Sequence, residues 1–148
     1  MTAVVSSRAK LRTRLYGVAA IVALFGLADG IYLTVEHVTG RTAQCIASSG
    51  CQDVLSSKYA AMGPIPLASL GALAYFSAFS CAILAAFGYP KCRTLFGLLV
   101  AVMFAMTLWL LYLQASVLHA FCDYCLFSAA VTTALTLIAV TSAFLRDQ

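Results

Sequence analysis

The chain has 148 residues, of which 63% are hydrophobic and only 9% are charged. Soluble domains carry about 25% charged residues, so this composition excludes an ordinary soluble domain and indicates an integral membrane protein. The net charge of +4 comes from basic residues in short flanks rather than in one patch, which argues against a nucleic-acid partner.

Four predominantly apolar stretches are long enough to cross a bilayer, because about 20 helical residues span its hydrocarbon core. They cover residues 15–35, 67–87, 95–116 and 124–145, and a short basic turn at 88–93 separates the second from the third. We therefore predict an all-α integral membrane protein, a four-transmembrane-helix bundle that forms a single domain over residues 1–148. Such a bundle can enclose a cofactor without a second subunit, so we expect a monomer.

The basic residues are distributed unequally between the two ends of this bundle. Arg41 and Lys58 fall on the side of the first loop, whereas the others fall on the side of both termini: Arg8, Lys10, Arg12, Arg14, Lys91, Arg93 and Arg146. Positively charged flanks favour the cytoplasmic side of a membrane. We therefore expect cytoplasmic termini, with the loop 36–66 and the segment before residue 124 on the extracytoplasmic, oxidising side.

The loop 36–66 contains two of the six cysteines, Cys45 and Cys51. From Cys51 onward, apolar residues recur at helical spacing on one face: Cys51, Val54, Leu55, Tyr59 and Met62. This pattern predicts a short amphipathic helix that lies across the open end of the bundle and brings Cys51 to the membrane surface. The stripe also fits a packing surface with an incidental cysteine.

A second cysteine pair, in Cys122-Asp123-Tyr124-Cys125, opens the last apolar stretch. The partial positive charge of a helix N-terminus favours a thiolate there, and the i, i+3 spacing places both sulfurs on one face. Two cysteine pairs on one side of a membrane can form a relay of thiol–disulfide exchange. Static disulfides or a four-thiolate metal site are the alternatives, although the five residues between Cys45 and Cys51 exceed the usual spacing of metal ligands.

Taken together, these residues resemble the vitamin K epoxide reductase (VKOR) family in its bacterial, standalone form, from about residue 15 to the end of the chain. The resemblance is carried by Tyr32-Leu33-Thr34, Cys45, the segment from Cys51-Gln52-Asp53-Val54-Leu55 to Ser56-Ser57-Lys58-Tyr59, Gly63, Pro66, Gly71, Tyr75 and the Cys122–Cys125 motif. It implies a four-helix bundle that binds a quinone at its extracytoplasmic end.

The resemblance also implies a role for each site residue. Cys45 and Cys51 would take electrons from a thioredoxin-like partner, Cys51 would pass them to Cys122, and Cys125 would face the quinone. Ser57 matches the family's serine near the active site, although a helical wheel places it about 240° from Cys51. Many bacterial relatives carry a fused thioredoxin-like domain; none is expected here, so the partner would be a separate protein.

The expected acceptor is ubiquinone or menaquinone, and a vitamin K-type quinone or its epoxide is the alternative substrate. A DsbB-like oxidase also has four spans and two cysteine pairs, but its Cys-x-x-Cys lies early, whereas here it opens the last helix. A non-catalytic membrane protein with structural disulfides or a bound metal is the alternative from another class.

The two remaining cysteines, Cys81 and Cys92, are interpreted as small apolar residues. Asp29 lies inside the first span and either supplies protons to the reaction or is a polar residue packed within the bundle. The same two interpretations apply to His119, near the outer end of the third span.

Overall fold

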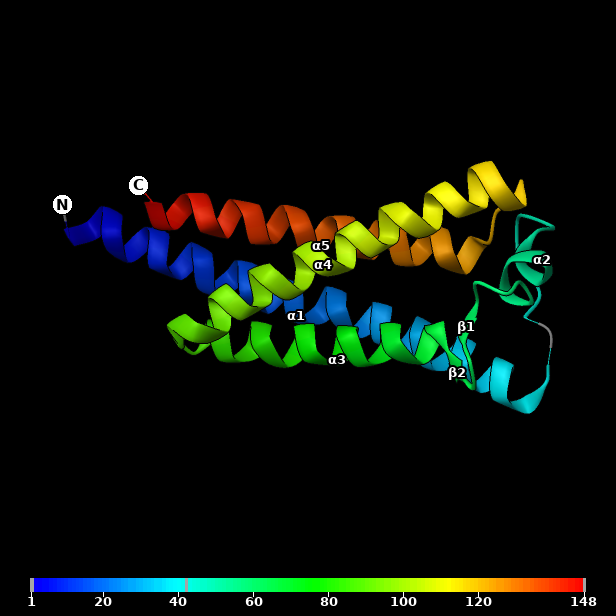
Figure 1. Ribbon diagram of the computed structural model, residues 1–148. Coiled ribbons are helices and arrows are strands. Elements are labelled where there is room, and N and C mark those ends of the chain that lie inside the picture. The colour runs from blue at the N-terminus through cyan, green and yellow to red at the C-terminus, as the bar shows by residue number, and fades with distance from the viewer. Residues whose placement is uncertain (1, 42, 148) are drawn as a thin grey trace.

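Four long helices make up most of the protein (Figure 1). The computed structural model describes residues 2–41 and 43–147, and for residues 2–6, 146 and 147 it describes the backbone alone. The helices are α1 (Thr2–Thr39), α3 (Leu67–Ala86), α4 (Pro90–Leu113) and α5 (Asp123–Asp147). Both termini and the α3–α4 turn lie at one end of the bundle, and the short helix α2 (Cys51–Leu55) lies at the other.

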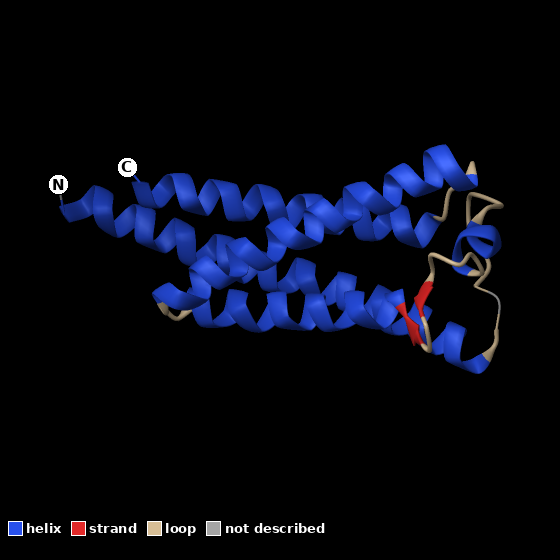
Figure 2. Cartoon of the chain, viewed as in Figure 1, coloured by secondary structure: helices blue, strands red, loops and turns tan. Residues whose placement is uncertain are grey.

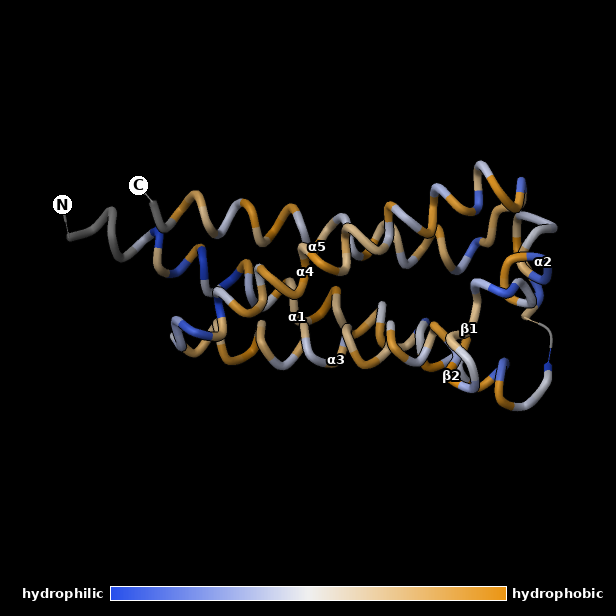
Figure 3. The backbone as a smooth tube through the Cα atoms, viewed as in Figure 1, coloured by the Kyte–Doolittle hydropathy of each residue, from blue (hydrophilic) through white to orange (hydrophobic). Residues whose placement is uncertain are grey.

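The helices are long and apolar enough to cross a membrane, over Ser7–Thr39, Leu67–Ala86, Pro90–Leu118 and Asp123–Leu145. Figure 3 shows hydrophobic residues along the middles of these helices and hydrophilic residues toward the two ends of the bundle. Large apolar side chains on the outer faces are exposed, as suits a surface that contacts lipid. The predicted all-α bundle of four membrane-spanning helices is confirmed.

The ends of two helices differ from the prediction. The helix α1 continues beyond residues 15–35 in both directions, and the segment before residue 15 contains several good helix formers, among them Ala9, Lys10 and Leu11. The helix α4 begins at Pro90 rather than at residue 95, since a proline at the first helical position loses no backbone hydrogen bond. The turn predicted at 88–93 is therefore shorter, and Lys91 and Arg93 lie in the first turn of α4.

Small residues pack the helices closely in the half of the bundle nearest the termini. Six alanines of α1 and α3 belong to this core: Ala19, Ala20, Ala23, Ala78, Ala82 and Ala85. Its other buried residues are Tyr16, Tyr75, Phe96, Val100, Val131, Leu135 and Cys81, which is buried as expected for a small apolar residue. Small side chains let helix backbones approach, and van der Waals packing then replaces the missing hydrophobic drive in lipid.

The opposite end of the bundle is covered by the loop between α1 and α3. The helix α2 has only five residues, and a two-stranded hairpin follows it, β1 (Ala61–Met62) and β2 (Ile65–Pro66), drawn red in Figure 2. The predicted apolar stripe is therefore interrupted: Tyr59 lies in a turn, and Met62 lies in β1 with 65% of its surface exposed. Ser56 and Ser57 end the helix because their hydroxyls bond to backbone carbonyls of Gln52 and Val54.

A π-helical turn, η1 (Gln114–Leu118), continues α4 at the loop end. It ends at His119, which has the left-handed φ of 49°, and the Ala120 N–H then donates to the carbonyl of Gln114 at 3.2 Å. A π-turn accommodates an additional residue within a helix and is frequent at functional sites. Here it directs the chain back across the end of the bundle, so that Cys122 immediately precedes α5.

Candidate active site

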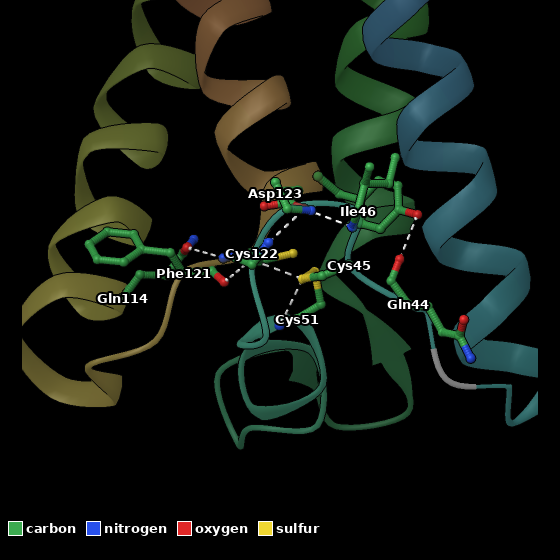
Figure 4. Close-up of a disulfide and its surroundings, with 11 residues drawn as sticks. Gln44, Cys45, Ile46, Cys51, Gln114, Phe121, Cys122 and Asp123 are labelled. Carbon is green, nitrogen blue, oxygen red and sulfur yellow. Dashed lines mark hydrogen bonds between the residues drawn. A yellow bond between two sulfur atoms is a disulfide. The ribbon is translucent and has the colours of Figure 1, made fainter.

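The outer cysteines form a disulfide. Cys45 lies in the loop after α1 and Cys51 is the first residue of α2, with Cα atoms 5.6 Å apart (Figure 4). The Cys51 N–H donates to Cys45 Sγ at 3.1 Å, and Ser48 Oγ lies 3.0 Å from the same sulfur. Cys45 is half-buried, whereas Cys51 is 1% exposed. A thiol arriving from solvent therefore meets Cys45 before Cys51.

The inner cysteines are free thiols directly beneath this disulfide. Cys122 is fully buried, and its carbonyl accepts the Leu126 N–H at 3.0 Å, as an N-cap residue does. Cys51, Val54 and Cys122 form one buried cluster, against which Cys45 and Cys125 pack. The structure thus brings all four cysteines of the expected relay into a single group.

The surroundings of Cys122 favour its ionised form. A hydrogen bond from the Cys125 thiol is the largest influence and, with backbone N–H groups of Cys125 and Tyr124, lowers the pKa of Cys122 to about 7 against the opposing effect of burial. Backbone N–H groups at the start of a helix stabilise a thiolate in this way. A lowered pKa of Cys122 suits both a nucleophile and a leaving group in disulfide exchange.

A cavity of about 370 Å³ opens between the helices next to the inner cysteines. Its lining is mainly apolar and comes from all four long helices and the covering loop. Cys125 lies in its wall, where the polar residues include Asp29, Ser57, Tyr75, Gln114 and Ser128, with Glu36, His37 and Arg41 toward the covering loop. Small-molecule sites are commonly concave, mainly apolar and about 300–1,000 Å³, with a few polar groups that orient the ligand. The donor groups and the volume therefore fit a planar quinone ring beside Cys125.

Ser57 lines this cavity, which the helical wheel did not anticipate. It lies beyond the end of α2, so the angle of 100° per residue does not apply to it, and its hydroxyl donates to the Val54 carbonyl at 2.8 Å. Asp29 lines the same cavity from α1 and is half-buried. His119 is exposed at the end of η1, where it forms the left-handed turn.

Gln114 is a site residue that the sequence analysis did not identify. It is 2% exposed, and its Oε1 accepts the Cys122 N–H at 3.2 Å. Gln114 and Cys125 also both line the cavity. The sequence does contain one indication of this role, because Gln114 is the one amide side chain in the apolar stretch 95–116.

Tyr75 is held firmly in the cavity wall. Its hydroxyl lies 2.7 Å from Ser128 Oγ and 2.8 Å from Thr132 Oγ1, and it donates to the Ser128 carbonyl at 3.0 Å. These bonds connect α3 to α5 below Cys125. A hydroxyl so fully bonded fixes the distance between the two helices on either side of the cavity.

The outer sulfurs and the Asp123 carboxylate lie within 4.8 Å of one another, a spacing that a metal ion could bridge. A metal, however, requires thiolates, and both sulfurs are joined in the disulfide. In this oxidation state the group offers a metal only the carboxylate.

Comparison with known proteins agrees with this arrangement. Residues 18–140 match the model of the Vitamin K epoxide reductase family, a stretch that includes all four cysteines of the site. The chain is also 33% identical over 128 residues to the thiol-disulfide oxidoreductase LTO1 of Arabidopsis thaliana. This match covers 80% of the present chain and 34% of LTO1. It therefore spans about a third of the length of this relative. The resemblance that the order of the cysteines indicated is confirmed, and the chain belongs to the vitamin K epoxide reductase family.

Proposed function

We propose that this protein is a quinone-dependent thiol–disulfide oxidoreductase that generates disulfides in a separate thioredoxin-like protein. One observation carries the proposal: the sulfurs lead from solvent to the cavity, through half-buried Cys45, the buried cluster of Cys51 and Cys122, and Cys125 in the cavity wall. The name of the Arabidopsis relative, a thiol-disulfide oxidoreductase, supports the same reaction class.

The outer pair accepts two electrons from the partner. A thiolate of the partner attacks the Cys45 sulfur, the bond between Cys45 and Cys51 breaks, and Cys51 leaves as a thiolate. The partner's second thiolate then attacks its own mixed disulfide and releases Cys45. The partner leaves with a new disulfide, and the outer pair is reduced to two thiols.

The outer pair then reduces the inner pair. The Cys51 thiolate attacks the Cys122 sulfur and displaces Cys125, and the Cys45 thiolate attacks Cys51 to restore the outer disulfide. Cys122 leaves as a thiolate in this second exchange, which its pKa of about 7 favours. The result is an outer disulfide above an inner dithiol, the oxidation state that the structure presents.

The cavity is the place where the inner dithiol loses its electrons. A quinone there would take two electrons and two protons and leave as hydroquinone, while the bond between Cys122 and Cys125 forms again. Ser57 and Tyr75 line the cavity with hydroxyls that bond to the Val54 carbonyl and to Ser128 and Thr132, and Asp29 is placed to hold a proton at the cavity wall. The mainly apolar lining suits the ring of such a ligand.

The proposed location follows from the distribution of charge. Both termini lie at the end of the bundle that carries most of the basic residues, and the cysteine pairs lie at the other end. The positive-inside rule then supports cytoplasmic termini and an extracytoplasmic active site. The resemblance to the bacterial, standalone form of the family suggests a bacterial inner or plasma membrane for this multi-pass protein. The partner would act in that extracytoplasmic space.

The test is anaerobic quinone reduction by the purified protein in detergent, with a reduced thioredoxin-like protein as the electron donor. Cys45→Ala, Cys51→Ala, Cys122→Ala and Cys125→Ala should each abolish turnover with this donor, and Cys92→Ala, a thiol at the other end of the bundle, should not. Vitamin K epoxide offered in place of the quinone distinguishes the alternative substrate. A parent protein that never reduces quinone, with four cysteine variants that behave alike, would overturn the proposal.

A further inference from the structure

The second residue of the Cys-x-x-Cys motif holds the loop that carries the outer disulfide. Asp123 Oδ2 accepts three consecutive backbone N–H groups, from Ile46 at 2.8 Å, Ala47 at 2.6 Å and Ser48 at 3.2 Å (Figure 4). Consecutive N–H groups that converge on one point form a concave site for an anion, and here the anion is a side chain of the protein. The residues so held directly follow Cys45.

Two further hydrogen bonds join the same pair of segments. Ser48 Oγ donates to the Phe121 carbonyl at 2.8 Å, and the Tyr124 hydroxyl donates to the Gln44 carbonyl at 3.1 Å. Residues on both sides of Cys45 are therefore bonded to residues on both sides of Cys122. Every one of these contacts joins the outer loop to the start of α5, across more than 70 residues of sequence.

We propose that Asp123 is a positioning residue that keeps the outer cysteine loop against Cys122, so that exchange between the two cysteine pairs is intramolecular and fast. The proposal rests on the relay proposed above. Exchange requires the attacking sulfur to approach along the axis of the disulfide that it breaks, so a small displacement of one partner slows it greatly. A carboxylate on three N–H groups resists such a displacement because charge-assisted hydrogen bonds are stronger than neutral ones.

The contact acts at one defined step. When the outer pair is reduced, a bond forms between Cys51 and Cys122, the bond between Cys122 and Cys125 breaks, and Cys125 receives the electron pair. The Asp123 carboxylate bonds backbone N–H groups rather than either sulfur, so it is free to hold the loop in both oxidation states. It acts through the loop and neither gives nor takes a proton in the exchange.

The test measures the effective concentration of Cys51 at Cys122 without quinone or protein donor. A background with Cys45→Ala, Cys125→Ala, Cys81→Ala and Cys92→Ala retains only the thiols of Cys51 and Cys122. Equilibration of this protein in glutathione buffers of known ratio gives the fraction that forms the disulfide between Cys51 and Cys122. Because this equilibrium requires no turnover, it can fail or succeed independently of the proposed enzymatic function.

Asp123→Ala in this background should lower the effective concentration by about tenfold to a hundredfold, the range that a displacement of about 1 Å produces. Asp123→Asn keeps one acceptor oxygen and should give an intermediate value. Asp53→Asn is the matched control, because Asp53 is an exposed acid of the same loop, and it should change nothing. Ser48→Ala removes the bond to the Phe121 carbonyl but leaves the backbone N–H groups on Asp123, and it should give a smaller loss in the same direction.

An effective concentration for Asp123→Ala within twofold of its parent would overturn the proposal. So would an equal loss in Asp53→Asn, because the effect would then reflect the charge of the loop and not the contact. If Asp123→Ala does not fold, as judged by helical circular dichroism in detergent, Asp123→Asn and Ser48→Ala carry the same test. Unchanged values in both of those variants would then refute it.

Discussion

Gly50, the residue before Cys51, packs directly against the segment that precedes Cys122. A methyl group added to its Cα would lie 2.7 Å from the Phe121 carbonyl oxygen, 2.8 Å from the Phe121 nitrogen and 3.0 Å from Ala120 Cβ. Two of these atoms belong to the backbone and cannot rotate away. To restore an ordinary contact distance, the loop must withdraw by about 0.7 Å, and Cys51 is the next residue. We therefore expect Gly50→Ala to slow exchange between Cys51 and Cys122 by about tenfold or more.

Stopped-flow mixing of the oxidised protein with a reduced protein donor, followed by acid quenching and thiol labelling, resolves this step. Gly50→Ala should reduce its outer disulfide at the parental rate and pass the electrons to the inner pair slowly, so that the reduced outer pair accumulates. Gly97→Ala is the control, because a methyl group there meets open space. This account of the contact would be refuted if Gly50→Ala forms its outer disulfide normally and then passes electrons to the inner pair at the parental rate.

Three further predictions concern the inner pair and the cavity wall. Alkylation of reduced Cys122 should accelerate as pH rises through about 7, the pKa that the Cys125 thiol sets by its hydrogen bond. In Cys125→Ala that midpoint should move upward toward the ordinary value for a thiol, and an unchanged midpoint would contradict the assignment. Gln114→Leu leaves the buried Cys122 N–H without its acceptor and should cost about 1–3 kcal/mol of unfolding free energy, seen as a lower Tm in detergent. Tyr75→Phe removes the bonds to Ser128 and Thr132 and should cost about 1 kcal/mol in the same measurement, while a Tm equal to that of the parent would show that the bonds contribute nothing.

The bundle itself could be predicted from the sequence because its main signal is local. An apolar stretch of about 20 residues has few alternatives to a membrane helix, whatever the rest of the chain does. Helix ends carry less information, and α1 and α4 both extend beyond the apolar stretches into charged residues. The loop helix was predicted too long because a periodic apolar pattern does not reveal that the hydroxyls of Ser56 and Ser57 compete for the backbone carbonyls.

The cysteines of the site could be identified from their type and spacing, whereas the residues that hold them could not. The roles of Gln114 and Asp123 depend on contacts with segments distant in the sequence, and a single sequence contains no record of such contacts. Ser57 was named only because the family has a serine there, since its place in the cavity wall depends on where α2 ends. Tertiary contacts, not local patterns, decide these positions.

The π-helical turn η1, at the end of α4, requires a set number of residues between α4 and α5. Because a π-turn accommodates one additional residue, deletion of a residue within η1 would leave an ordinary helical turn and remove the wide bond from the Ala120 N–H to the Gln114 carbonyl. The segment that carries Cys122 back to the Gln114 amide would then be one residue shorter. The turn between α3 and α4, by contrast, is exposed at all three of its residues, 87–89, and lies at the end of the bundle away from the cysteines. Changes in chain length should therefore be tolerated at the end near the termini and excluded from the end near the cysteines.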